Sequence, residues 1–239
     1  MSEGRGDADI AQVAGLLAEP ARAAMLTALL GGRALAAGEL ARIAGVTAST
    51  ASAHLTRMLA AGMVTVVPQG RHRYYRLANA EVAELLETMA RVSPRVPVRS
   101  LRESRQARRL AAARTCYDHL AGRAGVDLLS ALVEGGHLEA GDDAYTVTPL
   151  GEITLKELGV DLDEVRRSRR RFAPACLDWT ERRPHLGGGL GAAITAALIR
   201  LGWFEHGPER RALRVAGRAR DGLAAIRAGA FPGGRAASA

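Results

Sequence analysis

The sequence contains very little lysine, cysteine or aromatic residue for its length. Its 239 residues include one lysine (Lys156), two cysteines, three Phe, four Tyr and two Trp. Two cysteines exclude a disulfide framework. No apolar run reaches the roughly 18 residues of a membrane-spanning helix, and the polar start MSEGRGDADI does not have the pattern of a signal peptide. We therefore expect a cytoplasmic, globular protein without a membrane partner.

The most informative absence is that of carboxylates in one part of the chain. Between Leu40 and Ala80 there is no Asp or Glu. The same stretch contains the arginines Arg42, Arg57, Arg71, Arg73 and Arg76. Carboxylates normally recur every few residues on a protein surface, so a stretch without them that carries several guanidinium groups favours binding to a polyanion.

Residues 39–60 have the pattern of a helix-turn-helix. Residues 39–44 predict a short helix that Gly45 ends, because glycine accepts the left-handed conformation that follows a helix. Thr47 or Ser49 can cap a second helix. Its apolar stripe, at i, i+4, i+7 and i+8, consists of Ala51, Leu55, Met58 and Leu59. The opposite face is small and polar, as a helix in a major groove requires.

A basic hairpin follows this second helix. Gly62 ends the helix, and the alternating residues 64–66 and 74–76 predict two strands joined by a turn at residues 68–71. The whole pattern predicts a winged helix-turn-helix with double-stranded DNA as its partner. The residues expected to contact DNA are Thr47, Ser49, Thr50, Ser52, His54 and Arg57 in the helix, and Arg71 and Arg73 in the wing.

These residues resemble the DNA-binding core of ArsR/SmtB-type transcriptional repressors over residues 10–92. The shared features are Glu39-Leu40, Gly45, Ser49-Thr50, Ser52, His54-Leu55, Leu59, Ala61-Gly62 and the wing from Gly70-Arg71 to Tyr74-Tyr75. Many members carry arginine or glutamine before the motif histidine, where this chain has Ala53. The resemblance implies a homodimer that represses transcription at an operator, with the first helix carrying the dimer contact.

The chain is expected to be mainly α-helical with small β-hairpins, in two domains. We expect the winged helix-turn-helix over residues 8–93, a proline-containing linker over 94–97, a helical sensor and dimerisation domain over 98–228, and a disordered tail over 229–239. In the second domain, a long helix is predicted from Val98 to about Gly122. Two later segments, beginning at Gly136 and Gly202, repeat the outline of a glycine-terminated helix, a wing-like hairpin and a further helix.

The sequence names no cofactor, but it offers candidates for sensing a signal. Two familiar metal patterns of the family are missing: residues 39–44 contain no cysteine, and residues 80–92 contain no His or Asp pair. Cys116 and His119 share one face of the predicted long helix, and Cys176 and His185 could complete a set of two cysteines and two histidines. A metal ion, thiol oxidation or a small organic effector are alternative signals, and two buried cysteines without such a role are the simplest interpretation.

Three classes of function fit the chain to different degrees. A sequence-specific DNA-binding regulator, released from its operator by an effector in the second domain, fits best. An enzyme with Cys116 or Cys176 as nucleophile has no supporting nucleophile elbow, carboxylate pair or nucleotide fingerprint, so we expect no enzyme. A winged-helix interaction module without DNA contact is the third alternative, and it predicts binding that is blind to DNA sequence.

Overall fold

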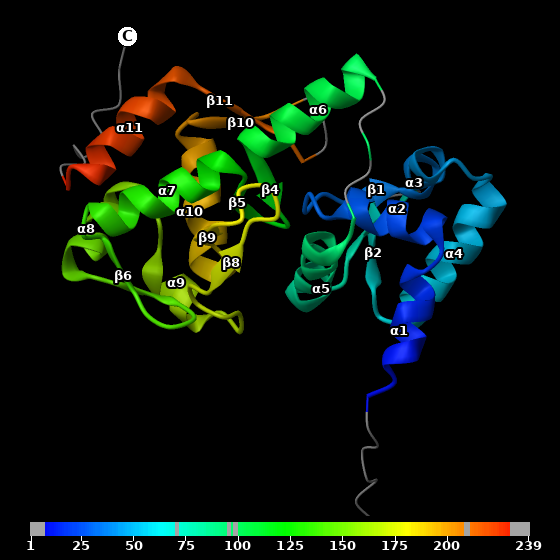
Figure 1. Cartoon of the computed structure of the whole chain (residues 1–239). Helices are drawn as coiled ribbons and strands as arrows, with labels where there is room; N and C mark the ends of the chain where they lie inside the picture. Colours follow the sequence, from blue (N-terminus) through cyan, green and yellow to red (C-terminus); the bar gives the residue numbers. More distant parts are fainter. Residues whose placement is uncertain (1–7, 70–71, 95–96, 98–99, 208–210, 230–239) are drawn as a thin grey trace, which may run out of the picture. The chain divides into compact units, whose positions relative to one another are not determined.

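The computed structural model describes residues 8–69, 72–94, 97, 100–207 and 211–229 (Figure 1). The chain divides into two compact units, Met1–Leu86 and Glu87–Ala239. Half of the predicted linker 94–97, and all of the predicted tail 229–239 except its first residue, lie outside the described residues, which omit 95–96 and 230–239. Within the described residues, no helix combines the length and the apolar character needed to cross a membrane.

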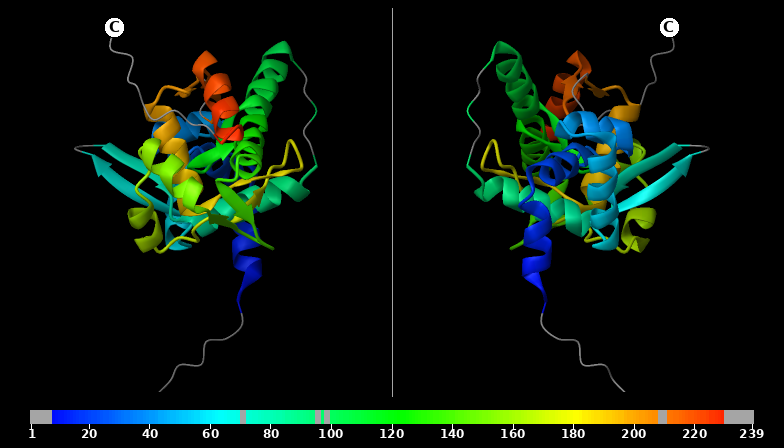
Figure 2. Two further views of the ribbon diagram at one scale, coloured as in Figure 1. Left: turned by 90° about the vertical axis from the view of Figure 1, so that its left-hand side faces the viewer. Right: turned by 90° about the vertical axis from the view of Figure 1, so that its right-hand side faces the viewer.

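The first unit is a winged helix-turn-helix, as the sequence predicts. Three helices pack around Met25, Leu26, Leu40 and Leu55, which are almost completely buried. The hairpin strands project from these helices as an arm, visible in both views of Figure 2. The elements are α1 (Ile10–Leu17), α2 (Pro20–Leu29), β1 (Leu35–Ala36), α3 (Ala37–Ala44), α4 (Ala48–Ala60), β2 (Val64–Gln69), β3 (His72–Leu77) and α5 (Ala80–Val92), the last of which continues into the second unit.

The local signals read from the sequence account for the turn between α3 and α4. Gly45 adopts φ 66°, the left-handed conformation that ends α3. Thr47 is the N-cap of α4, and its side chain accepts a hydrogen bond from the backbone N–H of Thr50 at 3.2 Å. The sheet has one strand that the sequence did not indicate: β1 pairs with β3, with Leu35 opposite Tyr75.

The predicted long helix from Val98 to Gly122 is wrong. Helix α6 (Leu101–Ala112) ends early, and β4 (Arg114–Cys116) and β5 (His119–Ala121) form a tight antiparallel hairpin instead. Tyr117 at the turn has φ 60°, which no helix accommodates. The backbone N–H of Thr115 also donates to the carbonyl of Arg211 at 2.9 Å, a partner far along the chain. Long-range pairing therefore overrides the local helical pattern.

The second unit consists largely of a tandem repeat, which extends the repetition seen in the sequence. Each copy is a hairpin, a helix, a second hairpin and a further helix. The same spacing separates His119 from His185 and Gly122 from Gly188, and both glycines have positive φ, at 75° and 69°. The first copy is β4, β5, α7 (Arg123–Glu134), β6 (Leu138–Ala140), β7 (Tyr145–Val147) and α8 (Pro149–Glu157); the second is β8 (Ala175–Leu177), β9 (Pro184–Leu186), α10 (Gly188–Arg200), β10 (Phe204–His206), β11 (Leu213–Val215) and α11 (Gly217–Arg227), with α9 (Leu162–Arg167) between them.

The two copies interlock reciprocally through a glycine in the first turn of each central helix. A Cβ atom added at Gly125 of α7 would lie 2.4 Å from the Leu120 carbonyl oxygen and 3.4 Å from the Cβ of His185. The equivalent atom at Gly191 of α10 would lie 2.3 Å from the Leu186 carbonyl oxygen and 3.2 Å from the Cβ of His119. Each copy therefore packs closely against the histidine of the other.

Candidate functional site

The outer face of α4 has the properties of a surface that contacts DNA. Thr47, Ser49, Thr50, Ser52 and Arg57 are all exposed, whereas the opposite face of the helix is buried in the core. The hydroxyl of Thr47 lies 2.9 Å from that of Ser49 and 2.8 Å from that of Thr50, so the N-terminus of α4 presents a cluster of short hydroxyl groups. Small side chains let a helix approach base edges and phosphates closely.

The wing contributes one described basic side chain of the two predicted. Arg73 of β3 is exposed and lies opposite Pro68 of β2. The predicted contact residue Arg71 lies outside the described residues. An exposed arginine on a projecting strand is suited to contact with a phosphate group.

His54 is half-buried and is held by a residue that sequence reasoning missed. The Nη1 of Arg22 lies 3.3 Å from the Nδ1 of His54. Arginine has only donors, so Nδ1 accepts and the remaining proton of neutral His54 is on Nε2. Arg22 is 8% exposed, and its other donors bond the carbonyl oxygens of Leu16 at 2.7 Å and Gly15 at 2.9 Å. Arg22 therefore fixes the ring of His54 to the end of α1.

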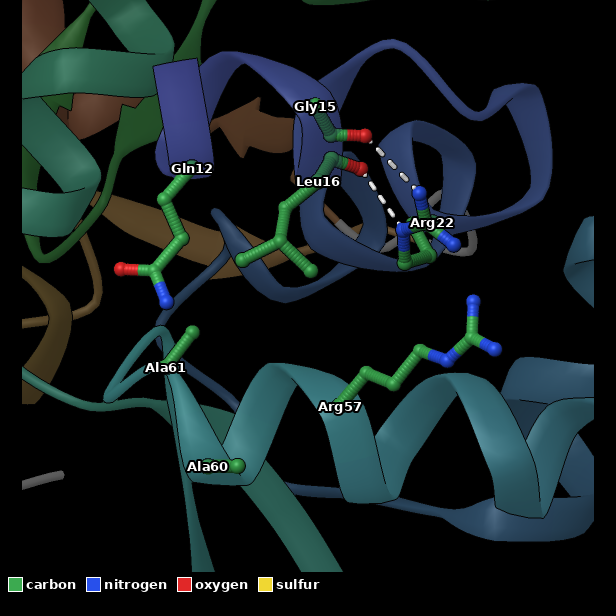
Figure 3. Close-up of a pocket in the computed structure, with 7 residues that line it drawn as sticks. All are labelled: Gln12, Gly15, Leu16, Arg22, Arg57, Ala60 and Ala61. Atoms are coloured by element: carbon green, nitrogen blue, oxygen red, sulfur yellow. Dashed lines mark hydrogen bonds between the residues drawn. The ribbon is translucent and has the colours of Figure 1, made fainter. Parts of the chain in front are cut away.

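A concavity of about 360 Å³ lies between α1, α2 and α4, lined by Gln12, Gly15, Leu16, Arg22, Arg57, Ala60 and Ala61. Figure 3 shows Arg57 extending from α4 toward the guanidinium group of Arg22. No lining residue is acidic. Two guanidinium groups facing one concavity without a carboxylate make it electropositive, which suits a phosphate group.

The second unit brings Cys116, His119, Cys176 and His185 together. Their potential ligand atoms all lie within 4.8 Å of one another, and the two sulfur atoms are 4.0 Å apart. Each pair is built by one hairpin, since Cys116 is directly opposite His119 and Cys176 is directly opposite His185. Sequence reasoning selected these four residues but placed the first two on a helix, whereas the structure pairs them across β4 and β5.

Each hairpin also carries an aspartate two residues after its cysteine. The Nδ1 of His119 lies 3.5 Å from Asp118, and the Nδ1 of His185 lies 3.8 Å from Asp178. Each aspartate is in turn bound by an arginine. Arg170 reaches both carboxylate oxygens of Asp118, at 2.5 and 3.1 Å, and the buried Arg114 bonds Asp178 at 2.8 Å. These arginines fix the carboxylates, and the carboxylates lie where they can orient the imidazole rings.

Charge is separated within this cluster. Hydrogen bonding to Cys116 lowers the pKa of the Cys176 thiol far below its usual range, and His119 and His185 lower it further. The same contact and burial raise the pKa of Cys116. Burial acts to lower the pKa of His119, but Asp118 and the sulfur of Cys176 outweigh it and raise this pKa to about 9. These interactions therefore favour negative charge on Cys176 and positive charge on His119, and they oppose charge on Cys116.

Comparison with protein families and curated relatives gives two matches. The family described as "Helix-turn-helix domain" matches residues 17–67. A relative from Bacillus subtilis (strain 168), "Uncharacterized HTH-type transcriptional regulator YdfF", is 42% identical over 207 residues, which cover 87% of this chain and 92% of the relative. The second match therefore extends well beyond the helix-turn-helix region.

Solved structures similar to this chain overlap about a third of it. NolR from Sinorhizobium fredii is 26% identical, covers 34% of this chain and 81% of its own, and has a TM-score of 0.32. The homodimeric winged helix-turn-helix DNA-binding domain Mb0332 from Mycobacterium bovis is 28% identical, covers 36% of this chain and 85% of its own, and has a TM-score of 0.30.

Proposed function

Because this chain belongs to the HTH-type transcriptional regulators, and is thus a DNA-binding transcriptional regulator, we propose that it is a dimeric, sequence-specific repressor of the ArsR type. In this proposal α4 enters the major groove of an operator and the β2–β3 wing lies along the adjacent backbone. Binding of the dimer blocks a promoter. A signal received by the second unit then releases the dimer from the operator.

The observation that carries the proposal is the exposed face of α4. Its hydroxyl cluster at Thr47, Ser49 and Thr50 and the exposed Ser52 can reach base edges or phosphate oxygens. Arg57 is exposed on the same helix. No carboxylate occurs on α4 or on the described strands of the wing. The face is therefore attractive to DNA without a charge that repels phosphate.

His54 and the concavity beside it supply further candidate contacts. With Nδ1 bonded to Arg22, the Nε2–H of His54 is free to donate to an acceptor such as the N7 or O6 of guanine. Arg57 and Arg22 face the concavity between α1, α2 and α4. A phosphate group bound in this concavity would lie next to the base that His54 contacts. The phosphate contact, which adds affinity, and the base contact, which selects the sequence, would then be neighbours.

We assign the dimer contact to α1, together with α5. Helix α1 has no charged residue and none of its residues is buried; Ile10 is 76% exposed. On α5, Leu85, Met89 and Val92 recur at i, i+4 and i+7 and are 37%, 38% and 81% exposed. Apolar helix faces without cover in a single chain are suited to burial against the same faces of a second copy.

The proposal is tested by selecting duplexes from a random DNA pool with the full-length protein and sequencing those retained. A dimer that reads DNA is expected to enrich one motif repeated with two-fold symmetry, its half-sites about one helical turn apart. A reporter promoter carrying that motif should be silenced when the protein is present. Retention of DNA without any enriched motif would contradict sequence-specific binding, and activation of the reporter would contradict repression.

A further inference from the structure

The cluster of Cys116, His119, Cys176 and His185 lies outside the DNA-binding surface and has no role in the function proposed above. Its potential ligand atoms lie within 4.8 Å of one another. We propose that these four side chains bind one Zn(II) ion, which ties together the two copies of the repeat in the second unit. The site does not depend on whether the first unit represses transcription.

The spacing of the two sulfur atoms suits a shared ion. Two sulfurs bonded to one tetrahedral zinc at about 2.3 Å lie about 3.8 Å apart. The sulfur atoms of Cys116 and Cys176 are 4.0 Å apart, and both cysteines are free thiols. A disulfide would require a separation of about 2.05 Å, and so a larger movement of the two sulfur atoms than the ion requires.

The chemistry of the ligands selects the kind of metal. Two thiolates and two imidazoles in a tetrahedral set are typical of zinc, whereas calcium and magnesium require oxygen ligands. The carboxylates beside the histidine rings, Asp118 and Asp178, are already bound by Arg170 and Arg114. Two thiolates also balance the charge of a divalent ion, so the loaded site would be neutral where it is buried.

The histidines have the surroundings of metal ligands. Within the described part of the chain, both ring nitrogens of His119 and of His185 are buried and have no hydrogen-bond partner. The Nδ1 atoms lie 3.5 Å from Asp118 and 3.8 Å from Asp178, respectively. A carboxylate beside one ring nitrogen leaves the other for the metal, an arrangement that orients the ring and raises its basicity. The bound ion would use the Nε2 atoms, because the Nδ1 atoms lie beside the carboxylates.

The position of the four ligands indicates what the ion does. One cysteine and one histidine come from the β4–β5 hairpin and the other two come from the β8–β9 hairpin. Cys116, His119 and His185 are buried and Cys176 is half-buried. Four protein ligands complete a tetrahedral site and leave no open position for a substrate, as in structural zinc sites. The ion therefore acts as a clamp between the two copies.

The test uses the untagged, full-length protein, fully reduced and kept free of oxygen, titrated with Zn(II) and examined by native mass spectrometry. We expect one ion per chain. Titration with Co(II), which takes the same ligands and has visible absorption, should give the spectrum of a tetrahedral ion with sulfur-to-metal charge transfer. The Co(II) bands should disappear when one equivalent of Zn(II) is added.

Variants separate this site from adventitious binding. Cys116→Ser and His185→Gln should lose the stoichiometric ion, whereas the exposed His206→Gln, a matched histidine control in the same unit, should retain it. Asp118→Asn, which keeps all four ligands, should weaken binding about 10- to 100-fold. Circular dichroism of each variant identifies any that does not fold, and Asp118→Asn tests the site without removing a ligand.

Three results would overturn the proposal. One is a folded, reduced wild-type protein that binds no stoichiometric Zn(II). Another is a Co(II) spectrum without sulfur-to-metal charge transfer. The third is a disulfide between Cys116 and Cys176 in the isolated protein together with no Zn(II) binding after reduction, which would assign the pair to thiol oxidation instead.

Discussion

The guanidinium group of Arg22 connects His54 on α4 to the end of α1. It lies 3.3 Å from the Nδ1 of His54 and bonds the carbonyl oxygens of Gly15 and Leu16. One buried side chain thus fixes the position of a predicted DNA contact and satisfies two carbonyl groups at a helix end. The orientation of His54 is therefore coupled to the helix to which we assign the dimer contact.

Replacing Arg22 by methionine should destabilise the first unit. Methionine keeps much of the volume but leaves the carbonyl groups of Gly15 and Leu16 without their donor, which costs about 1–3 kcal/mol. Denaturant unfolding followed by circular dichroism measures this change. The exposed Arg42→Met on α3 is the control and should change stability by less than about 0.5 kcal/mol. Equal stability of both variants would show that the hydrogen bonds of Arg22 to the end of α1 do not stabilise the first unit.

Removing a guanidinium group from the DNA-binding surface should weaken binding to every duplex alike. Arg57→Ala and Arg73→Ala each delete one exposed positive charge. The slope of log affinity against log salt should fall by about one unit for each variant. Arg220 is an exposed arginine on α11 of the second unit and is not part of the proposed DNA-binding surface. Arg220→Ala removes the same charge and should leave the slope unchanged. Fluorescence anisotropy at several salt concentrations distinguishes these results, and an unchanged slope for Arg57→Ala would exclude it from the interface.

Removing the hydroxyl of Ser52 should change which sequence binds best. Ser52 is exposed on α4, and loss of its hydroxyl should cost about 1 kcal/mol at the base pair it contacts while the salt dependence stays constant. Binding to a set of duplexes with single base-pair changes in the selected motif measures this effect. Thr56→Ser on the same face, which keeps a hydroxyl, is the matched control. If the Ser52→Ala variant and the wild type rank the duplexes identically, Ser52 does not contact a base.

A charge on the exposed apolar surface of α1 should separate the dimer. Ile10→Glu places a carboxylate at a side chain that is 76% exposed in the single chain, so it should leave the fold intact and oppose burial against a second copy. Sedimentation velocity should show a shift from dimer to monomer. Ile153→Glu, at a residue 59% exposed in the second unit, should remain dimeric. If both variants sediment as the wild type does, the dimer contact lies elsewhere.

Gly125→Ala should destabilise the second unit, although alanine favours a helix more than glycine does by about 1 kcal/mol. Its Cβ would lie 2.4 Å from the Leu120 carbonyl oxygen, so α7 must shift away from the β4–β5 hairpin within the first copy, at a cost of about 1–3 kcal/mol. Gly217→Ala on α11 meets no atom within 4 Å and should be neutral or stabilising. Thermal unfolding of the two variants gives the comparison. A neutral Gly125→Ala would show that α7 and the β4–β5 hairpin are not closely packed there.

The sequence predicted those features that depend on neighbouring residues. The left-handed Gly45, the capping Thr47 and the apolar stripe of α4 are local, and they fix the helix-turn-helix. The role of Arg22 was not predictable in this way, because its burial depends on carbonyl groups at the end of α1 that face it only after packing.

The second unit was predicted less well, because its hairpins depend on distant partners. The residues around Cys116 have a helical pattern, but the backbone of Thr115 pairs with Arg211 and turns the segment into a strand. The outline of the later hairpins was predicted, since glycine at the ends of α7 and α10 marks each one. The composition of the cysteine–histidine cluster could be proposed from residue types, whereas the arginine–aspartate pairs behind the histidines required the structure.

The measurement that tests the central claim most directly is the affinity of the full-length protein for the selected operator and for a scrambled duplex of the same composition, at one physiological salt concentration. If α4 reads the sequence, the operator should bind about a thousandfold more tightly or better. Equal affinities for the two duplexes would contradict the account, because charge alone would then explain the binding.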